Sequence, residues 1–211
     1  NKPIAIVEAK DNNHSMSDGM QQALNYAQMM NVPFVFSSNG DGFVFHNRYI
    51  QEGERETVLP LDGFPSPETL WEMYVEQNCI GPAQSKIIDE PYYVDNPNKQ
   101  PRYYQINAIN RTVEAIAAGQ DRVLLVMATG TGKTYTAFQI IWRLWNAGIK
   151  KRILFLADRT ALISQTFTND FAPFKDKMTW VTKQNFDTAH EIYLGLYQGL
   201  TGEDEDANSL F

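Results

Sequence analysis

Residues 123–134, which read Val-Leu-Leu-Val-Met-Ala-Thr-Gly-Thr-Gly-Lys-Thr, give the clearest indication of the fold. Its apolar first part predicts a buried strand over 122–128, and the sequence after it predicts a helix over 133–147. Gly130 and Gly132 let the backbone turn tightly, so that successive N–H groups point to one place at the start of the helix. A strand, a glycine-rich turn and a helix in this order predict a loop that binds nucleotide phosphates.

The polar side chains of this loop suit the same chemistry. Lys133 would neutralise the β- and γ-phosphates, and the Thr134 hydroxyl would hold the Mg²⁺ ion of Mg-ATP. Met127 stands where the generic pattern has glycine, and the resulting loop resembles that of superfamily 2 helicases and translocases. The residues assigned to nucleotide binding are Thr129, Gly130, Thr131, Gly132, Lys133 and Thr134. The alternative is a glycine-rich turn that binds no nucleotide.

A second nucleotide contact is expected upstream, in the tetrad Arg-Tyr-Tyr-Gln at 102–105. It resembles the glutamine motif of superfamily 2 proteins, whose side-chain amide can pair with both the donor and the acceptor on the edge of adenine. Arg102 and Gln105 are therefore candidates for the ATP site. The alternative is that they only begin the helix predicted over 105–118.

Strands and helices alternate through the second half of the chain. After the phosphate loop and its helix, a strand is predicted over 151–157 and a helix over 160–169. This alternation predicts a parallel sheet with helices on both faces. An Asp-Glu pair that ends an apolar strand, as ATP hydrolysis would require, is not found in 170–211. The acidic run 203–206 has the charges without the strand and reads as a solvated loop.

Composition excludes several classes of protein. The longest apolar run, 123–128, is far shorter than the roughly 20 residues of a membrane-spanning helix, so no membrane association and a cytoplasmic location are expected. Cys79 is the only cysteine; it cannot form an internal disulfide and is expected to be a small core residue. The net charge of −7 argues mildly against indiscriminate binding to nucleic acid. The chain lacks an initial Met and is interpreted as a piece of a longer protein.

The first 60 residues show a different pattern. A mostly apolar run over 3–9 predicts a strand, and helical spacing of apolar residues predicts a helix up to Met30 with Ser17 as its N-cap. Two Phe-Val-Phe triplets, at 34–36 and 43–45, flank a turn rich in Asn, Asp and Gly and predict a hairpin. The predicted order is strand, helix, strand, strand.

Four polar residues of this region suggest a reaction centre. Glu8 and Lys10 lie two positions apart on the first strand and so share a face. The Glu8 carboxylate could hold Mg²⁺ together with the carbonyl of Ala9, while the Lys10 ammonium could position water and offset charge on an attacked phosphate. Gln22 and Tyr26 are four apart and share a helix face. The alternative is a solvated strand end beside an ordinary polar helix face.

Together, Glu-Ala-Lys, Gln-x-x-x-Tyr and the hairpin resemble the RecB-like branch of the PD-(D/E)xK nucleases, in which the Gln and Tyr support DNA near the cleavage centre. Such a nuclease ahead of a superfamily 2 motor resembles the restriction (R) subunit of type I restriction–modification enzymes. The resemblance implies an α/β fold with three parts. These are the C-terminal part of a PD-(D/E)xK nuclease domain (1–60), a proline-interrupted connector (61–100) with one helix near 67–77, and the N-terminal part of a RecA-like parallel-sheet motor domain (101–211). The family's nuclease also uses an Asp on a preceding hairpin, which is expected to lie outside this chain.

The resemblance implies an activity as well as a fold. It implies ATP-driven translocation of double-stranded DNA followed by Mg²⁺-dependent cleavage, with ATP and Mg²⁺ as cofactors. Methyltransferase and specificity subunits would be the protein partners. Two alternatives fit the same motifs: a stand-alone or type III-like helicase-nuclease, and a non-catalytic ATP-gated scaffold that binds DNA.

Overall fold

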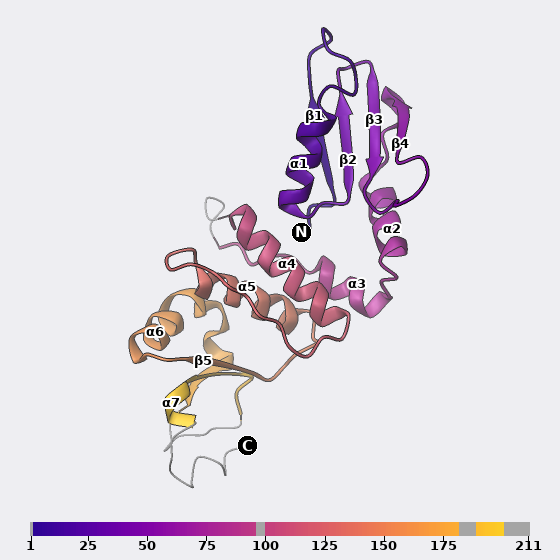
Figure 1. Ribbon diagram of the computed structural model, residues 1–211. Helices are drawn as coiled ribbons and strands as arrows, with labels where there is room; N and C mark the ends of the chain where they lie inside the picture. Colours follow the sequence, from indigo (N-terminus) through magenta and orange to yellow (C-terminus); the bar gives the residue numbers. More distant parts are fainter. Residues whose placement is uncertain (1, 96–99, 182–188, 201–211) are drawn as a thin grey trace. The chain divides into compact units, whose positions relative to one another are not determined.

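The computed structural model describes residues 2–95, 100–181 and 189–200, which form two compact units. The first unit comprises residues 1–89 and 100–119, and the second comprises 90–99 and 120–211. Each has its own sheet and its own helices, which confirms the expected α/β class (Figure 1). Among the helices of the described residues, none combines the length and the apolar character needed to cross a membrane.

The first unit contains a four-stranded sheet in the order β1-β2-β3-β4. The strands are β1 (Ala5–Ala9), β2 (Phe34–Ser38), β3 (Gly42–Asn47) and β4 (Glu56–Pro60). β1 and β2 are parallel, and the other pairs are antiparallel. Because β1 and β2 are parallel, the chain must cross over between them, and α1 (Met20–Met30) makes this crossover. The predicted order of strand, helix, strand and strand is confirmed; β4 was not predicted.

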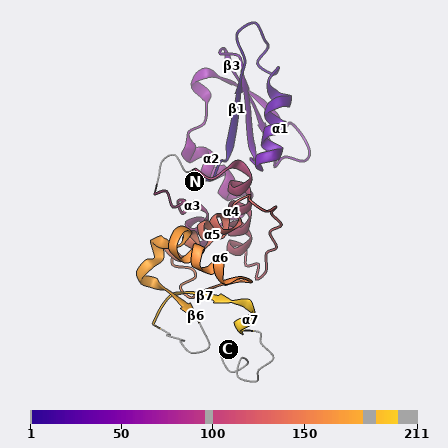
Figure 2. The same cartoon turned by 90° about the vertical axis from the view of Figure 1, so that its left-hand side faces the viewer.

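Strand β2 is the centre of this unit because it is buried along its whole length. Its side chains alternate between two apolar clusters, one on each face of the sheet. The cluster under α1 contains Met20, Ala23, Ala27, Val32, Val35 and Val44. The cluster on the opposite face contains Phe34, Phe36, Leu70, Tyr74 and Ile88. Figure 2 shows α1 lying along the sheet.

The N-cap of helix α1 lies two residues later than the predicted Ser17. Gly19 is the N-cap residue, and no side chain caps the helix there. Ser17 instead lies in a tight turn, in which its carbonyl accepts a hydrogen bond from the Met20 amide at 2.9 Å. The side chain of Asp18 accepts hydrogen bonds from Ser15 in the same turn. The prediction that Ser17 caps the helix was wrong, because the polar residues of this segment form hydrogen bonds within the turn instead of with the start of the helix.

The rest of the first unit is helical and contains more helix than the prolines suggested. Its elements are η1 (Leu61–Gly63), α2 (Pro67–Gln77), α3 (Pro82–Asp89) and α4 (Tyr103–Ala117). Helix α2 and the helix expected over 105–118 are confirmed. Helix α3 was missed because its proline was read as a break. Proline at the first position of a helix is well tolerated, since that residue's N–H has no partner in the helix.

Cys79 is exposed, so its predicted place in the core is wrong. It follows the C-cap residue of α2, Asn78, and has a left-handed backbone with φ of 51°. Its amide donates to the Glu76 carbonyl at 3.1 Å and so helps to end the helix. The position is therefore set by backbone conformation rather than by side-chain packing.

The second unit contains a three-stranded parallel sheet in the order β5-β7-β6, as the alternating pattern predicted. Its elements are α5 (Lys133–Asn146), β5 (Ile153–Ala157), α6 (Thr160–Gln165), the π-helical turn η2 (Thr166–Asp170), η3 (Ala172–Lys177), β6 (Met178–Val181), β7 (Ile192–Leu196) and α7 (Tyr197–Leu200). The core joins α5 to the sheet through Phe138, Ile163, Phe171, Phe174, Met178, Ile192 and Leu194. The acidic run 203–206 lies outside the described residues.

The strand predicted over 122–128 is not present among the described residues. Leu124 and Val126 are 85% and 89% exposed, respectively. Apolar composition favours burial, but a strand also needs a neighbouring backbone for its hydrogen bonds. The three described strands of the second unit pair with one another and leave this segment without a strand partner.

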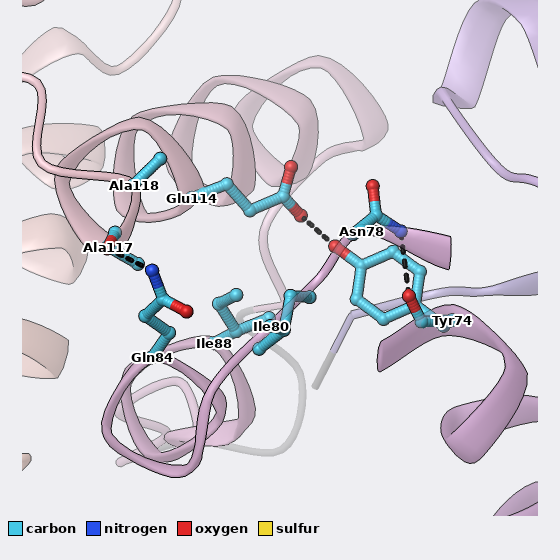
Figure 3. Close-up of a pocket in the computed structure, with 8 residues that line it drawn as sticks. All are labelled: Tyr74, Asn78, Ile80, Gln84, Ile88, Glu114, Ala117 and Ala118. Atoms are coloured by element: carbon cyan, nitrogen blue, oxygen red, sulfur yellow. Dashed lines mark hydrogen bonds between the residues drawn. The ribbon is translucent and has the colours of Figure 1, made fainter. Parts of the chain in front are cut away.

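Helices α2, α3 and α4 enclose a cavity of about 170 Å³ (Figure 3). Beside it, the Tyr74 hydroxyl donates to Glu114 Oε1 at 3.0 Å. Burial, and then the nearby Glu114 carboxylate, raise the pKa of Tyr74 far above its usual range. Glu114 also forms an ion pair with Lys2, whose side chain is only 5% exposed. One carboxylate therefore ties α4 to α2 and to the start of the chain.

We predict that Glu114→Ala lowers the free energy of unfolding by about 2–3 kcal/mol, because it leaves the Lys2 ammonium buried without a counter-charge. Urea unfolding of the wild-type and variant chains measures this change. Glu52→Ala is the matched control, since Glu52 is exposed and should cost less than about 0.5 kcal/mol. Equal effects of the two substitutions would show that Glu114 carries no such role.

Candidate functional site

The structure brings together the four polar residues predicted in the first unit. Lys10 Nζ donates to Glu8 Oε1 and to Gln22 Oε1, both at 3.0 Å. Gln22 Nε2 donates in turn to the Tyr26 hydroxyl at 3.1 Å. A continuous hydrogen-bonded chain therefore runs from the end of β1 along one face of α1.

Local geometry explains why these residues meet. Glu8 lies on the β1 face that α1 covers, and Lys10 continues the strand because its amide donates to the Ser38 carbonyl at 2.8 Å. On α1, Ala23 and Ala27 are buried against the sheet, which leaves the Gln22–Tyr26 face toward solvent. The side chains of Glu8 and Lys10 are 17% and 29% exposed. Both are shielded but can be reached by a ligand.

Two further residues, Gly19 and Ser37, lie at this site, and no local sequence pattern marks them. A Cβ atom on Gly19 would lie 2.8 Å from Glu8 Cγ and 2.8 Å from Ser37 Oγ, so the start of α1 packs directly on both side chains. Ser37 is paired in register with Glu8 on the neighbouring strand. Only the strand register reveals this pair, and a single sequence does not give the register.

The donor atoms at this site suit a hard divalent cation. The Glu8 carboxylate and the Ser37 hydroxyl are oxygen donors, and oxygen is the ligand that Mg²⁺ prefers. Ser37 Oγ is buried and has no hydrogen-bond partner among the described residues, so this oxygen is available to a ligand. No cluster of three or more Asp, Glu, His or Cys residues occurs among residues 2–95, 100–181 and 189–200. Glu8 is the carboxylate of this residue set.

The phosphate loop of the second unit has the backbone that the glycines predicted. Gly130 and Gly132 have φ angles of 79° and 82°, and α5 begins directly after the second of them. Lys133 Nζ donates to the carbonyl of Ala128 at 3.2 Å and to that of Met127 at 3.4 Å. Two carbonyls of the loop's own backbone thus hold the lysine.

The threonines of the loop differ in their environment. The Thr131 hydroxyl donates to the Ala128 carbonyl at 2.7 Å and so stabilises the turn. Thr129 is exposed, and Thr134, at the second position of α5, is partly exposed. The hydroxyl predicted to hold the Mg²⁺ of Mg-ATP is therefore open to a ligand at the N-terminus of a helix.

The residues of the predicted glutamine motif contact each other in the first unit. Gln105 is buried, and its Oε1 accepts a hydrogen bond from the Arg102 amide at 2.9 Å. Arg102 Nη1 donates to the Tyr104 hydroxyl at 3.3 Å. The first contact caps the N-terminus of α4, as the alternative reading of this tetrad expected. Recognition of adenine by these residues stays a prediction.

Comparison with known proteins places this phosphate loop in a family. A protein-family model described as "Type III restriction enzyme, res subunit" (ResIII) matches residues 98–211. The chain belongs to this family. The ResIII match includes α4, the phosphate loop and all of the parallel sheet. It supports the helicase-like, RecA-type reading of the second half of the sequence.

Two known relatives of the chain are subunits of type I restriction enzymes. The chain is 55% identical over 205 residues to the EcoAI endonuclease subunit of a type I restriction enzyme from Escherichia coli, an alignment covering 97% of this chain and 25% of that protein. It is 28% identical over 242 residues to the EcoKI endonuclease subunit of E. coli K12, covering 91% of this chain and 19% of that protein. The chain thus spans about a quarter or less of these relatives. The resemblance to type I restriction subunits is confirmed.

A solved structure agrees with this assignment. It is a fragment assigned as the HsdR subunit of a type I restriction enzyme from Vibrio vulnificus YJ016, with a TM-score of 0.77 and 35% identity. The match covers 94% of this chain and 36% of that one. The first and second units of this chain therefore both align to the Vibrio vulnificus fragment.

We predict that Gly19→Ala destabilises the protein by about 1–3 kcal/mol through overpacking against Glu8 and Ser37. Gly19 has φ of −82°, which any residue adopts, so backbone strain does not enter. Urea unfolding measures the effect, with Gln28→Ala on the exposed face of α1 as a control expected to be near neutral. A Gly19→Ala protein as stable as the control would contradict the close packing of α1 on these side chains.

Proposed function

We propose that this chain is part of a type I restriction subunit that couples ATP-driven translocation of double-stranded DNA to Mg²⁺-dependent cleavage of both strands. The hydrogen-bonded chain from Glu8 through Lys10 and Gln22 to Tyr26 is the observation that carries the nuclease half. The glycine-rich loop at the start of α5 carries the motor half. The relatives' names and the ResIII match support the combination.

In the nuclease half, each residue has a distinct role. Glu8, with the Ala9 carbonyl, would hold Mg²⁺, which supplies positive charge at the attacked phosphate and an activated water. Lys10, held between Glu8 and Gln22, places a second positive charge beside the same phosphate. Gln22 and Tyr26 lie on the solvent side of α1 and would support the DNA strand near the cleavage centre.

In the motor half, the contacts of Lys133 are those that ATP would replace. Lys133 would exchange the carbonyls of Met127 and Ala128 for phosphate oxygens, a stronger interaction because those oxygens are charged. The exposed amides of the loop and the start of α5 would surround the same phosphates. Thr134 would hold the Mg²⁺ ion that accompanies ATP. We also propose that Arg102 and Gln105 contact the adenine end of the nucleotide.

We propose that the chain is divided into three functional segments. Residues 1–60 would be the C-terminal part of the nuclease domain, 61–100 the connector, and 101–211 the N-terminal part of the first motor domain. The compact units divide the chain differently, since α2, α3 and α4 all belong to the first unit. In the cell, DNA and the methyltransferase and specificity subunits would be its partners, in the cytoplasm.

One alternative has specific support. The ResIII description names a type III enzyme, so a type III-like helicase-nuclease shares the motor half. The type I relatives favour the first proposal, because the EcoAI match covers 97% of the chain and so includes the first unit as well. Cleavage that requires methyltransferase and specificity subunits of the type I kind distinguishes the two.

We predict that single substitutions in the full-length protein can abolish DNA cleavage without abolishing ATP hydrolysis. Glu8→Gln should reduce DNA cleavage at least about 100-fold and leave DNA-stimulated ATP hydrolysis unchanged, because it removes the cation's carboxylate only. Lys133→Ala should reduce ATP hydrolysis at least about 100-fold, and cleavage with it, because translocation would stop. Phosphate release and plasmid linearisation measure the two activities.

Glu52→Gln controls for the loss of a carboxylate elsewhere in the first unit, since Glu52 is exposed. It should change neither activity. Undiminished cleavage by Glu8→Gln would refute the nuclease assignment, and DNA-stimulated ATP hydrolysis by a folded Lys133→Ala protein would refute the motor assignment.

A further inference from the structure

The hydroxyl of Ser37 is buried and makes no hydrogen bond within the described part of the chain. It lies on β2, in the centre of the sheet, on the face covered by α1. The adjacent serine behaves in the opposite way: Ser38 Oγ donates to the Gly42 carbonyl at 2.8 Å and accepts from the Gly40 amide at 3.1 Å. A buried hydroxyl without a partner is destabilising, so its presence at one of two neighbouring serines calls for a physical reason.

The surroundings of Ser37 point to Glu8. The two residues are paired in register on parallel strands, so their side chains emerge on the same face. Both Ser37 Oγ and Glu8 Cγ lie 2.8 Å from the position that a Cβ on Gly19 would occupy. The absence of a side chain at Gly19 therefore leaves room in which the hydroxyl and the Glu8 side chain lie close together.

Charge determines which hydrogen-bond donor can stay beside the Glu8 carboxylate when it binds a cation. The Lys10 ammonium donates a hydrogen bond to the Glu8 carboxylate at 3.0 Å. A divalent cation bound to the same carboxylate repels that ammonium and weakens its hold on Glu8. A neutral donor does not suffer this repulsion. Ser37 is a neutral donor next to Glu8, and its hydroxyl has no hydrogen-bond partner among the residues that the structure describes.

We propose that Ser37 is a positioning residue of the divalent-cation site. Its hydroxyl donates a hydrogen bond to the Glu8 carboxylate when that carboxylate binds a cation, and so fixes the oxygen that faces the metal. The inference rests on the proposed nuclease function. It assigns to Ser37 a role in cation affinity, while Lys10 keeps its role beside the attacked phosphate.

Ser37→Ala in the full-length protein tests this proposal. Free Mn²⁺ is measured by electron paramagnetic resonance during a titration without nucleotide, and hydrogen–deuterium exchange follows the peptide that contains β2. Ser37→Ala should raise the Kd for Mn²⁺ about ten- to a hundredfold, because a hydrogen bond to a charged group is lost. Exchange in β2 should be unchanged or slower, since the substitution removes an unsatisfied buried group. Cleavage should need more Mg²⁺ yet reach the wild-type rate at saturation.

Ser38→Ala is the matched control and should show the reverse pattern. It removes two satisfied hydrogen bonds of the hairpin, so exchange should become faster while Mn²⁺ affinity stays as in the wild type. Wild-type Mn²⁺ affinity in Ser37→Ala, or faster exchange in β2 without a change in affinity, would overturn the proposal. Glu8→Gln shows whether Glu8 holds the cation at all. If Glu8→Gln does not weaken Mn²⁺ binding, the proposed nuclease site fails; if it does and Ser37→Ala does not, only the role of Ser37 fails.

Discussion

The parallel pairing of β1 with β2 is the constraint on which the candidate nuclease site depends. A parallel pair requires a crossover, and α1 is the crossover that brings Gln22 and Tyr26 to the end of β1. The same pairing sets Ser37 beside Glu8. Close approach of α1 requires a residue without a side chain at position 19. Sheet register, helix packing and site chemistry thus follow from one backbone arrangement.

Within this frame, Lys10 is the residue that connects the chemistry. Its ammonium contacts the carboxylate of Glu8 and the carbonyl oxygen of Gln22, and Gln22 in turn contacts Tyr26. The lysine is thereby held in one place without being fully buried. Under the proposed function, its charge would be available to a phosphate. In the second unit, the ammonium of Lys133 is likewise held, by the carbonyls of Met127 and Ala128. Under the proposed function, phosphate oxygens would replace these carbonyls.

Residues with a local signature could be predicted from the sequence. The phosphate loop, Glu8 with Lys10, and Gln22 with Tyr26 each lie within a few positions of one another, and strand or helix periodicity alone places them on one face. Residues that depend on register or on distant partners could not be predicted in this way. Ser37 and Gly19 belong to this second group, because only the pairing of β1 with β2 brings them to Glu8. The strand expected over 122–128 failed for a related reason, since apolar composition does not specify a neighbouring strand.

We propose that the Glu8–Lys10–Gln22–Tyr26 chain forms part of a divalent-cation centre for DNA cleavage. Anomalous X-ray diffraction from crystals of the full-length protein soaked in Mn²⁺ tests this proposal. We expect an anomalous peak at about 2.0–2.6 Å from a carboxylate oxygen of Glu8, and we expect Glu8→Gln crystals to lack it. Mn²⁺ bound elsewhere in the nuclease domain, with Glu8 still paired to Lys10 and no peak beside it, would show that Glu8 does not hold the cation.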